Sequence, residues 1–253
     1  MPIRPDLSDR SILVTGAGRG LGKAMAEKLA SCGATVAVVD IDAAACERVA
    51  EGIRSSGGRA LPFPADVADR SAMMDVAARF AAERGRIDAV INNAMLLRYE
   101  PIEQVTEETL ERMVRIGING SVWGAQALLA HYDPETGGAI INMASPVAER
   151  GYPNTAVYSL VKGAIVTLTK VLAVELGPRG IRVNALAPGS VPTPGALGLN
   201  DPAEYERRKR TIPLRRLGRE EDNAEACAFL LSPEASFING EILHVDGGIA
   251  AAG

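Results

Sequence analysis

The chain alternates between short apolar runs and longer segments in which apolar residues recur at helical spacing. Short apolar runs bounded by glycine or polar residues are typical of buried strands, and an apolar residue every three or four positions is typical of a helix packed on one face. The pattern predicts strands over 11–16, 34–40, 59–67, 87–94, 138–145, 181–189 and 240–248. It predicts helices over about 20–32, 42–56, 69–84, 113–127, 156–176 and 219–231.

Strands that are separated by helices of ten or more residues indicate βαβ units with parallel strands. The crossovers of such units are right-handed and place helices on both faces of the sheet. We therefore expect an α/β fold, with a doubly wound parallel β-sheet of about seven strands and helices on both faces. No linker, repeat or low-complexity tract interrupts the pattern, so residues 1–253 are predicted to form a single domain.

Residues 190–217 interrupt the alternation with four prolines and no sustained apolar period. A loop of this length in a compact domain is usually functional, often as a lid, or else disordered. We predict a substrate or lid loop at this position.

The composition suits a soluble globular protein, because 47% of the residues are hydrophobic and 23% are charged. A formal net charge of −4 gives no reason to expect nucleic acid as a partner, since that footprint is strongly basic. One local cluster of basic residues is an exception to this acidic balance. It is interleaved with glutamates, and we interpret it as a solvated loop and helix face. Its members are Arg207, Arg208, Lys209, Arg210, Arg215, Arg216 and Arg219.

The three cysteines, Cys32, Cys46 and Cys227, form neither a disulfide framework nor a metal-ligand pattern, which favours a reducing compartment. The first ten residues lack the apolar core of a signal peptide. No stretch approaches the ~18 to 20 uncharged apolar residues of a membrane helix. We expect a cytoplasmic protein without membrane contact.

A glycine-rich turn, "LVTGAGRGLG" at 13–22, joins the first predicted strand to the first helix. Gly16, Gly20 and Gly22 permit a tight turn and close approach of the backbone to a pyrophosphate at the helix N-terminus. Such a turn also occurs without a ligand. Asp40 strengthens the cofactor interpretation, because it ends the second strand at the distance where an acidic residue binds the ribose 2′-hydroxyl of NAD.

Asp40 and Arg19 favour different cofactors. A carboxylate ~4 Å from the 2′-phosphate of NADP repels it by a few kcal/mol at an intermediate dielectric. Arg19 would instead pair with that phosphate. Because the carboxylate of Asp40 should lie directly at the ribose, we predict NAD (NADH) as the cofactor and NADP as the less favoured one.

The segment "YSLVK" places Tyr158 and Lys162 four residues apart, on one face of a helix. A tyrosine with a pKa near ~10 is a poor acid–base group at neutral pH, but a lysine ammonium and a positively charged nicotinamide would favour its phenolate. Lowering that pKa to about 7 takes ~4 kcal/mol of differential stabilisation. Ser145 ends a strand and is placed to donate a hydrogen bond to a substrate oxygen.

Together these residues resemble the short-chain dehydrogenase/reductase family, over about residues 10 to 249. The segments that carry the resemblance are "TGAGRGLG" (15–22), "ADV" (65–67), "NNA" (92–94), Ser145, "YSLVK" (158–162), "NALAPG" (184–189) and "INGEILHVDGG" (238–248). The resemblance implies a Rossmann fold and a nicotinamide-dependent oxidoreductase that acts on a small-molecule alcohol or carbonyl substrate. It identifies the family and no single substrate.

The resemblance also implies a role for individual residues. Tyr158 would be the general acid/base, Lys162 would hold the nicotinamide ribose and lower the pKa of the tyrosine, and Ser145 would orient the carbonyl. Asp66 and Val67 would contact the adenine, and Asn93 and Ala94 would lie along the adenosine. Val191 and Thr193 would contact the carboxamide of the nicotinamide. The implied cofactor-binding set is Gly16, Arg19, Gly20, Leu21, Asp40, Ile41, Asp66, Val67, Asn93, Ala94, Tyr158, Lys162, Val191 and Thr193.

Two positions depart from the family pattern. Gly117 stands where family members carry an asparagine that holds a proton-relay water, and Met95 stands where they carry a glycine. Asn119 lies about 200° further round the helix and replaces that asparagine only if the helix is irregular. Three interpretations of Gly117 are open. A second water fills the space that the missing side chain leaves, or a bulky neighbour such as Met95 or Met143 uses that space, or proton transfer is impaired.

Gly120 and Gly124 lie four residues apart, which suggests close helix–helix approach. Family members dimerise through this helix and the Tyr-Lys helix, so we expect a homo-oligomer, dimer or tetramer. The substrate pocket is predicted from residues 95–99, 146–153 and 190–215. The leading hypothesis is an NAD-dependent alcohol dehydrogenase or carbonyl reductase. The alternative is a dinucleotide-binding sensor or scaffold with vestigial catalysis.

Overall fold

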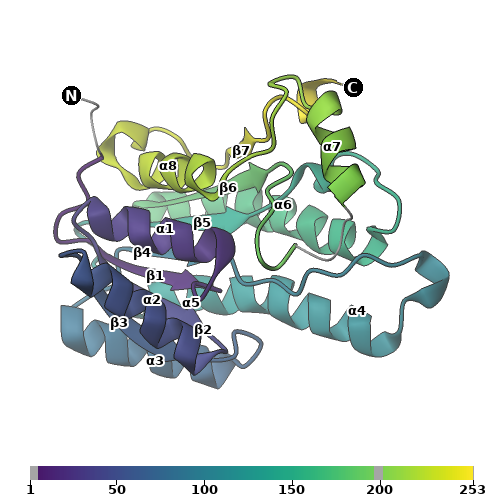
Figure 1. Ribbon diagram of the computed structural model, residues 1–253. Helices are drawn as coiled ribbons and strands as arrows, with labels where there is room; N and C mark the ends of the chain where they lie inside the picture. The colour runs from purple at the N-terminus through teal and green to yellow at the C-terminus, as the bar shows by residue number, and fades with distance from the viewer. Residues whose placement is uncertain (1–4, 197–201, 253) are drawn as a thin grey trace.

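The computed structural model describes residues 5–196 and 202–252, and a single parallel sheet organises this part of the chain (Figure 1). Its strand order is β3-β2-β1-β4-β5-β6-β7, and every pairing is parallel. The predicted doubly wound sheet of about seven strands is therefore confirmed. The strands are β1 (Ser11–Thr15), β2 (Thr35–Asp40), β3 (Arg59–Pro64), β4 (Ala89–Asn92), β5 (Gly138–Met143), β6 (Ile181–Pro188) and β7 (Ile242–Val245).

Helices cover both faces of the sheet, as expected for right-handed crossovers. Polar side chains fix where several of them begin: Asp42, Asp69 and Thr106 each accept a hydrogen bond from the backbone of the following first turn. The helices are α1 (Gly20–Ser31), α2 (Ala43–Ser55), α3 (Arg70–Arg84), α4 (Glu107–Val114), α5 (Gly120–His131), α6 (Ala156–Leu176), α7 (Pro202–Thr211) and α8 (Glu220–Leu231).

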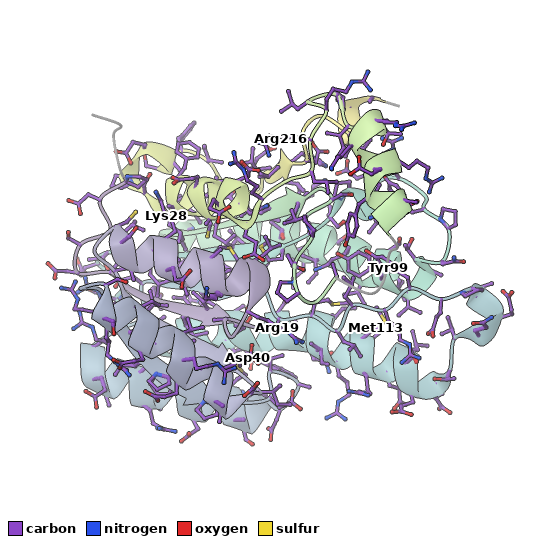
Figure 2. All side chains as sticks on the ribbon, viewed as in Figure 1. Arg19, Lys28, Asp40, Tyr99, Met113 and Arg216 are labelled. Atoms are coloured by element: carbon purple, nitrogen blue, oxygen red, sulfur yellow. The ribbon has the colours of Figure 1, made fainter. Side chains whose placement is uncertain are left out.

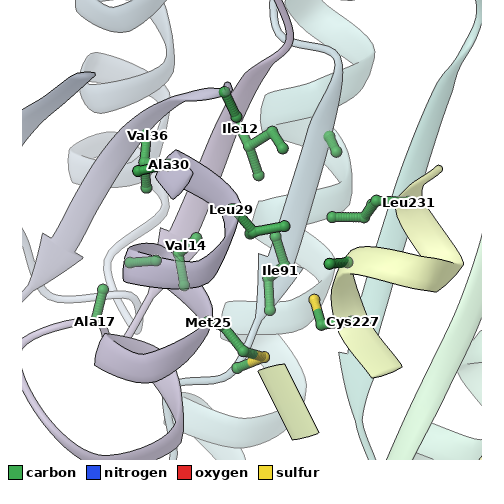
Figure 3. Packing of buried hydrophobic residues seen from close by; sticks show 14 of the residues in the cluster. Ile12, Val14, Ala17, Met25, Leu29, Ala30, Val36, Ile91, Cys227 and Leu231 are labelled. Atoms are coloured by element: carbon green, nitrogen blue, oxygen red, sulfur yellow. The ribbon is translucent and has the colours of Figure 1, made fainter. Parts of the chain in front are cut away.

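Two apolar cores lie on opposite faces of the sheet. On one face α1 and α8 run side by side, and Leu29, Cys227 and Leu231 meet Ile91 of β4 (Figure 3). On the other face α3, α5 and α6 bury Phe80, among others, against the sheet. With few aromatics available, both cores consist mainly of Ala, Val, Ile and Leu.

The sheet changes winding direction between β1 and β4, which are adjacent although two strands separate them in sequence. In open parallel sheets, ligands bind beyond the carboxyl ends of the strands at such a switch point. The glycine turn after β1, the segment after β4 and Ser145 after β5 all emerge at this edge. The topology therefore brings together the residues that the sequence predicts to be functional.

The glycine-bearing segment that we predicted as one helix over 113–127 is not continuous. Helix α4 ends at Val114, a π-helical turn spans Arg115–Asn119, and α5 begins at Gly120. Single π-helical turns interrupt the regular hydrogen-bond ladder and are frequent at functional sites. The irregularity that the three glycines permitted is therefore present.

The expectation of a loop over 190–217 is wrong in part, because α7 occupies Pro202–Thr211. Apolar periodicity could not predict this helix, since nearly all of its side chains are polar. Glu204 forms ion pairs with Arg207 and Arg208, three and four residues further along the helix. Ion pairs at these spacings stabilise exposed helices. Residues 197–201 of the predicted loop lie outside the described residues.

One helix of the described residues, Ala156–Arg179, is long and apolar enough to cross a membrane by length and composition, with a mean hydropathy of 1.6. Lys162 and Lys170 lie within this helix, so it does not provide the uncharged apolar stretch considered above. Core helices of soluble proteins meet the same criterion, and α6 packs on the sheet through Ile165, Thr169 and Ala173. Its opposite face exposes Leu160, Val171 and Val174.

Candidate active site

The turn between β1 and α1 is so tight that its glycines are required. Gly16 and Gly20 have φ values of +61° and +59°, in the left-handed region. A Cβ on Gly22 would lie 2.1 Å from the carbonyl oxygen of Gly16. The first turn of α1 contains no acidic residue, and the side chain of Arg19 does not cap it. The helix N-terminus is therefore suited to an anion, as the pyrophosphate interpretation requires.

Asp40 faces this turn from the end of β2. Its Oδ2 accepts a hydrogen bond from Gly18 N at 2.9 Å, and its Oδ1 accepts one from Asp42 N at 3.1 Å. Arg19 and Ile41 are exposed beside it, and Figure 2 shows Arg19 and Asp40 at the same end of the sheet. The carboxylate, the guanidinium and an apolar side chain thus surround the position where the turn would place a nucleotide.

The segment after β4 supports the turn from the other side. Asn93 Nδ2 donates to the carbonyl oxygens of Thr15 and Gly16, at 2.9 and 3.1 Å. Ala94 N donates to Thr15 Oγ1 at 3.1 Å. The amide of Asn93 therefore shapes the turn, a contribution that differs from the predicted contact with the adenosine.

The remaining residues of the predicted cofactor set frame the same edge. Asp66 is exposed and Val67 is buried after β3, where Val67 contacts Gly120. After β6, Val191 is buried, and Thr193 lies over Gly20, 3.4 Å from the position that a Cβ there would occupy. The partly buried Leu21 packs against the α1–α8 core. The glycine turn is therefore bordered by the segment after β3, the segment after β6 and the start of α1.

Ser145, Tyr158 and Lys162 come together where β5 meets α6. Ser145 lies close enough to Tyr158 for its hydroxyl to lower the pKa of the tyrosine. Lys162 Nζ donates to the carbonyl oxygen of Met143 at 2.6 Å and lies 5.6 Å from the ring centroid of Tyr158. The predicted catalytic residues therefore form one cluster, held by a strand end and one helix face.

Burial dominates the ionisation of this cluster. It raises the pKa of Tyr158 above its ordinary value, the neighbouring Tyr99 raises it further, and the hydrogen bond with Ser145 lowers it. Burial also lowers the pKa of Lys162 to about 8. The side chains of the protein alone thus do not produce the phenolate-favouring environment that we expected; a bound cationic ring would have to supply it.

Similarity to known proteins identifies the family of this chain. A family model described as enoyl-(acyl carrier protein) reductase matches residues 16–250. The 4-formylbenzenesulfonate dehydrogenase TsaC1/TsaC2 of Comamonas testosteroni is 39% identical over 251 residues, covering 96% of this chain and 98% of that protein. The chain belongs to the short-chain dehydrogenase/reductase family.

Solved structures of the family share the fold over nearly the whole chain. A 7α-hydroxysteroid dehydrogenase complexed with NADH and 7-oxo glycochenodeoxycholic acid superposes with a TM-score of 0.92 at 31% identity, covering 96% of this chain and 95% of that one. A short-chain dehydrogenase from Burkholderia cenocepacia J2315 in complex with NADP gives 0.89 at 33% identity, covering 96% and 98%. The family thus uses a nicotinamide cofactor of either kind.

Gly117, at the family's asparagine position, leaves no open space. A Cβ there would lie 2.5 Å from Val161 Cγ1 and 2.9 Å from Met95 Sδ. Of the three interpretations, the structure favours the one in which a bulky neighbour uses the space. Val161 and Met95 both border this position, and Met95 is the other position that departs from the expected pattern.

The other two glycines of the segment are explained within the chain. A Cβ on Gly124 would lie 1.9 Å from Asn92 Oδ1, and one on Gly120 would lie 3.1 Å from Val67 Cγ2. Asn92 in turn donates from Nδ2 to Ser121 O and to Asn142 Oδ1. These glycines therefore admit a strand end and the segment after β3, and their spacing is not by itself a sign of helix–helix contact.

Tyr99 and Tyr205 lie in segments that the sequence predicts to form the substrate pocket, but neither was given a role of its own. The rings of Tyr99 and Tyr158 meet edge to face, with centroids 5.6 Å apart. Tyr205 of α7 donates to Ala196 O at 3.3 Å and acts electrostatically on Tyr99. The scarcity of aromatics in this chain is a further sequence feature that draws attention to them.

Two clefts flank the catalytic cluster without including Tyr158. One of about 800 Å³ is lined by residues 101–103, 147–156 and 159. The other, of about 1230 Å³, is lined by Gly189, Ser190 and parts of 213–225 and 244–251. Residues 147–153 line the first cleft, where Glu149 pairs with His244 and Arg150 donates to Ile249 O. The described residues contain no cluster suited to a metal ion.

Proposed function

We propose that this protein is an NAD-dependent oxidoreductase that interconverts an alcohol and a ketone or aldehyde. The observation that carries the proposal is the Ser145–Tyr158–Lys162 cluster, assembled beside a glycine turn whose geometry fits a dinucleotide. A bound nicotinamide supplies or accepts the hydride in this chemistry. Family membership supports the oxidoreductase class and leaves the substrate open.

In the proposed mechanism the residues of the chain handle orientation and the proton. The Ser145 hydroxyl donates to the substrate oxygen and fixes its position. The Tyr158 hydroxyl gives its proton to that oxygen during reduction and takes it back during oxidation. Lys162, held by Met143 O, lies beside the tyrosine ring and stabilises the phenolate when its ammonium is charged.

Asp40 supports NAD over NADP. Its carboxylate is bonded to the glycine turn itself, so a 2′-phosphate on the adjacent ribose would lie close to a fixed negative charge. Arg19 is exposed and would offset part of that repulsion. We expect NADH to bind at least about tenfold more tightly than NADPH.

We further propose a cytoplasmic homo-oligomer that acts on ring-containing carbonyl compounds. The exposed Leu160, Val171 and Val174 on α6 favour association of subunits. The compounds named with two relatives, 4-formylbenzenesulfonate and 7-oxo glycochenodeoxycholic acid, each contain rings, a formyl or oxo group and an acidic group. In this chain the aromatic ring of Tyr99 lies beside Tyr158 and suits a ring-containing substrate.

The test is NADH oxidation against a panel of ketones, aldehydes, sugars, ketoacyl thioesters and quinones, with Tyr158→Phe as control. Turnover that falls by about 10² to 10⁴ in the variant, with NADH binding retained, is the expected result. NADH binding without turnover of any compound would favour the second candidate, a dinucleotide-binding protein with vestigial catalysis. The specific observation behind that candidate is the filled space at Gly117.

A further inference from the structure

The charge of α7 contrasts with that of the whole chain. The protein carries a formal charge of −4, whereas residues 202–211 contain two acidic and four basic side chains. We expected this basic cluster to be a solvated face, and Arg207 fits that expectation because 75% of its side chain is exposed. Arg208 differs, since only 29% of its side chain is exposed.

Arg208 is directed back toward the edge of the sheet. Its Nε donates to Glu204 Oε1 at 2.7 Å, and its Nη1 lies 3.5 Å from Ser190 Oγ. Ser190 follows the end of β6 and directly precedes Val191 in the segment that closes over the glycine turn. The guanidinium is therefore placed between α7 and the edge at which the strands deliver the candidate site.

Two aromatic side chains connect Arg208 with the catalytic tyrosine. Burial raises the pKa of Tyr99, whose ring contacts the ring of Tyr158, and the positive charge of Arg208 offsets part of that rise. Tyr205 precedes Arg208 by three residues and therefore shares its face of the helix. Figure 2 shows Tyr99 beneath α7, on the same side of the molecule. This face of α7 thus places Tyr205 and Arg208 within electrostatic reach of Tyr99.

We propose that Arg208 binds an acidic group of the substrate, a carboxylate or sulfonate, and so selects acidic carbonyl compounds. The inference rests on the proposed function of the same site. A planar guanidinium forms two parallel hydrogen bonds with such groups, and these are stronger where solvent is partly excluded. Glu204 also accepts a hydrogen bond from Arg207, so it keeps a cationic partner when the substrate acid engages Arg208.

The test compares one acid with its neutral analogue, 4-formylbenzoate with methyl 4-formylbenzoate. We expect the wild-type protein to favour the acid at least tenfold in kcat/KM. Arg208→Gln should remove that preference, mainly by raising KM for the acid, and should change the ester by less than threefold. Arg208→Lys should restore part of the preference. Arg207→Gln, on the same helix and sharing Glu204, should change either value by less than twofold.

A binding measurement separates this inference from the proposed function. Calorimetric titration of the NADH-loaded protein with 4-formylbenzoate should show binding that weakens at least tenfold in Arg208→Gln. Arg208-dependent binding without turnover would support the inference and contradict the oxidoreductase proposal. Turnover of the ester as good as that of the acid, equal losses on both compounds in Arg208→Gln, or no binding of the acid would overturn the inference. An unchanged melting temperature of the variant shows that the fold is intact.

Discussion

The cofactor side and the carbonyl side of the site are determined by different kinds of contact. At the glycine turn, a Cβ on Gly22 or Gly16 would meet backbone atoms at 2.1 and 2.8 Å, so no other residue fits without moving the chain. At Gly117, the atoms in the way are the side chains of Val161 and Met95. Backbone contacts fix a sequence motif, whereas side-chain contacts allow paired substitutions. The cofactor side therefore keeps its glycine motif, whereas the carbonyl side keeps Ser145, Tyr158 and Lys162 but differs from the expected pattern at Gly117 and Met95.

Gly22→Ala should have the largest effect, because the carbonyl of Gly16 cannot withdraw without breaking the turn. We expect the free energy of unfolding to fall by about 2 to 3 kcal/mol and NADH binding to be lost. The matched control is Gly52→Ala in α2, where nothing lies within 4 Å and alanine should stabilise the helix by up to about 1 kcal/mol. Denaturant unfolding and NADH fluorescence titration measure both. A Gly22→Ala protein that binds NADH normally would contradict a backbone-determined cofactor side.

Lys162 should make stability depend on pH. Its pKa is lowered from 10.5 in the unfolded chain to about 8 in the fold, so between these pH values the unfolded state binds more protons. The free energy of unfolding should therefore rise with pH over this window, by up to about 3 kcal/mol. Lys162→Met should lack this rise. The measurement is denaturant unfolding of both proteins without nucleotide from pH 7 to 10.5, and parallel profiles would show that burial does not hold the pKa down.

Asp40→Ala should change which cofactor binds. Removing the carboxylate eliminates the repulsion of the 2′-phosphate, so NADPH should gain at least about tenfold relative to NADH. Arg19→Ala in the same background should reverse part of that gain, because the remaining cation pairs with the phosphate. Both ratios come from fluorescence titrations. Equal preference in wild type and Asp40→Ala would show that Asp40 serves only the turn.

Gly117→Asn should have the smallest effect, because flexible side chains can adjust to it. We expect kcat to fall by about two- to tenfold, since the asparagine displaces Met95 and Val161 near Lys162 and Tyr158. Met95→Gly, combined with Gly117→Asn, should recover most of the loss. An acceleration by Gly117→Asn alone would instead indicate a damaged proton relay in the natural protein.

Much of the fold followed from the sequence for a physical reason. Strands such as Ser11–Thr15 and Thr35–Asp40 are buried on both faces, so they appear as continuous apolar runs. Ser145, Tyr158 and Lys162 were found because four-residue helical spacing and a strand end place them together. In these cases local pattern and tertiary position agree.

The remainder depended on contacts that local pattern does not encode. The polar helix α7 is held by ion pairs, the π-helical turn at Arg115–Asn119 breaks the regular period, and Tyr99 reaches Tyr158 from a segment without periodicity. The raised pKa of Tyr158 without a bound nicotinamide also did not follow from the sequence, because it comes from burial and from the neighbouring Tyr99. The substrate side of the site is where these contacts concentrate.

The most direct test of the account is deuterium transfer from NADH labelled at C4 of the nicotinamide to a carbonyl compound, followed by mass spectrometry of the alcohol. The account predicts deuterium on the carbinol carbon with the wild-type protein. It predicts almost none with Tyr158→Phe under the same conditions, although that variant binds NADH equally well. Labelled alcohol formed at the same rate by both proteins would contradict the role of Tyr158, and no transfer to any carbonyl compound would contradict the proposed activity.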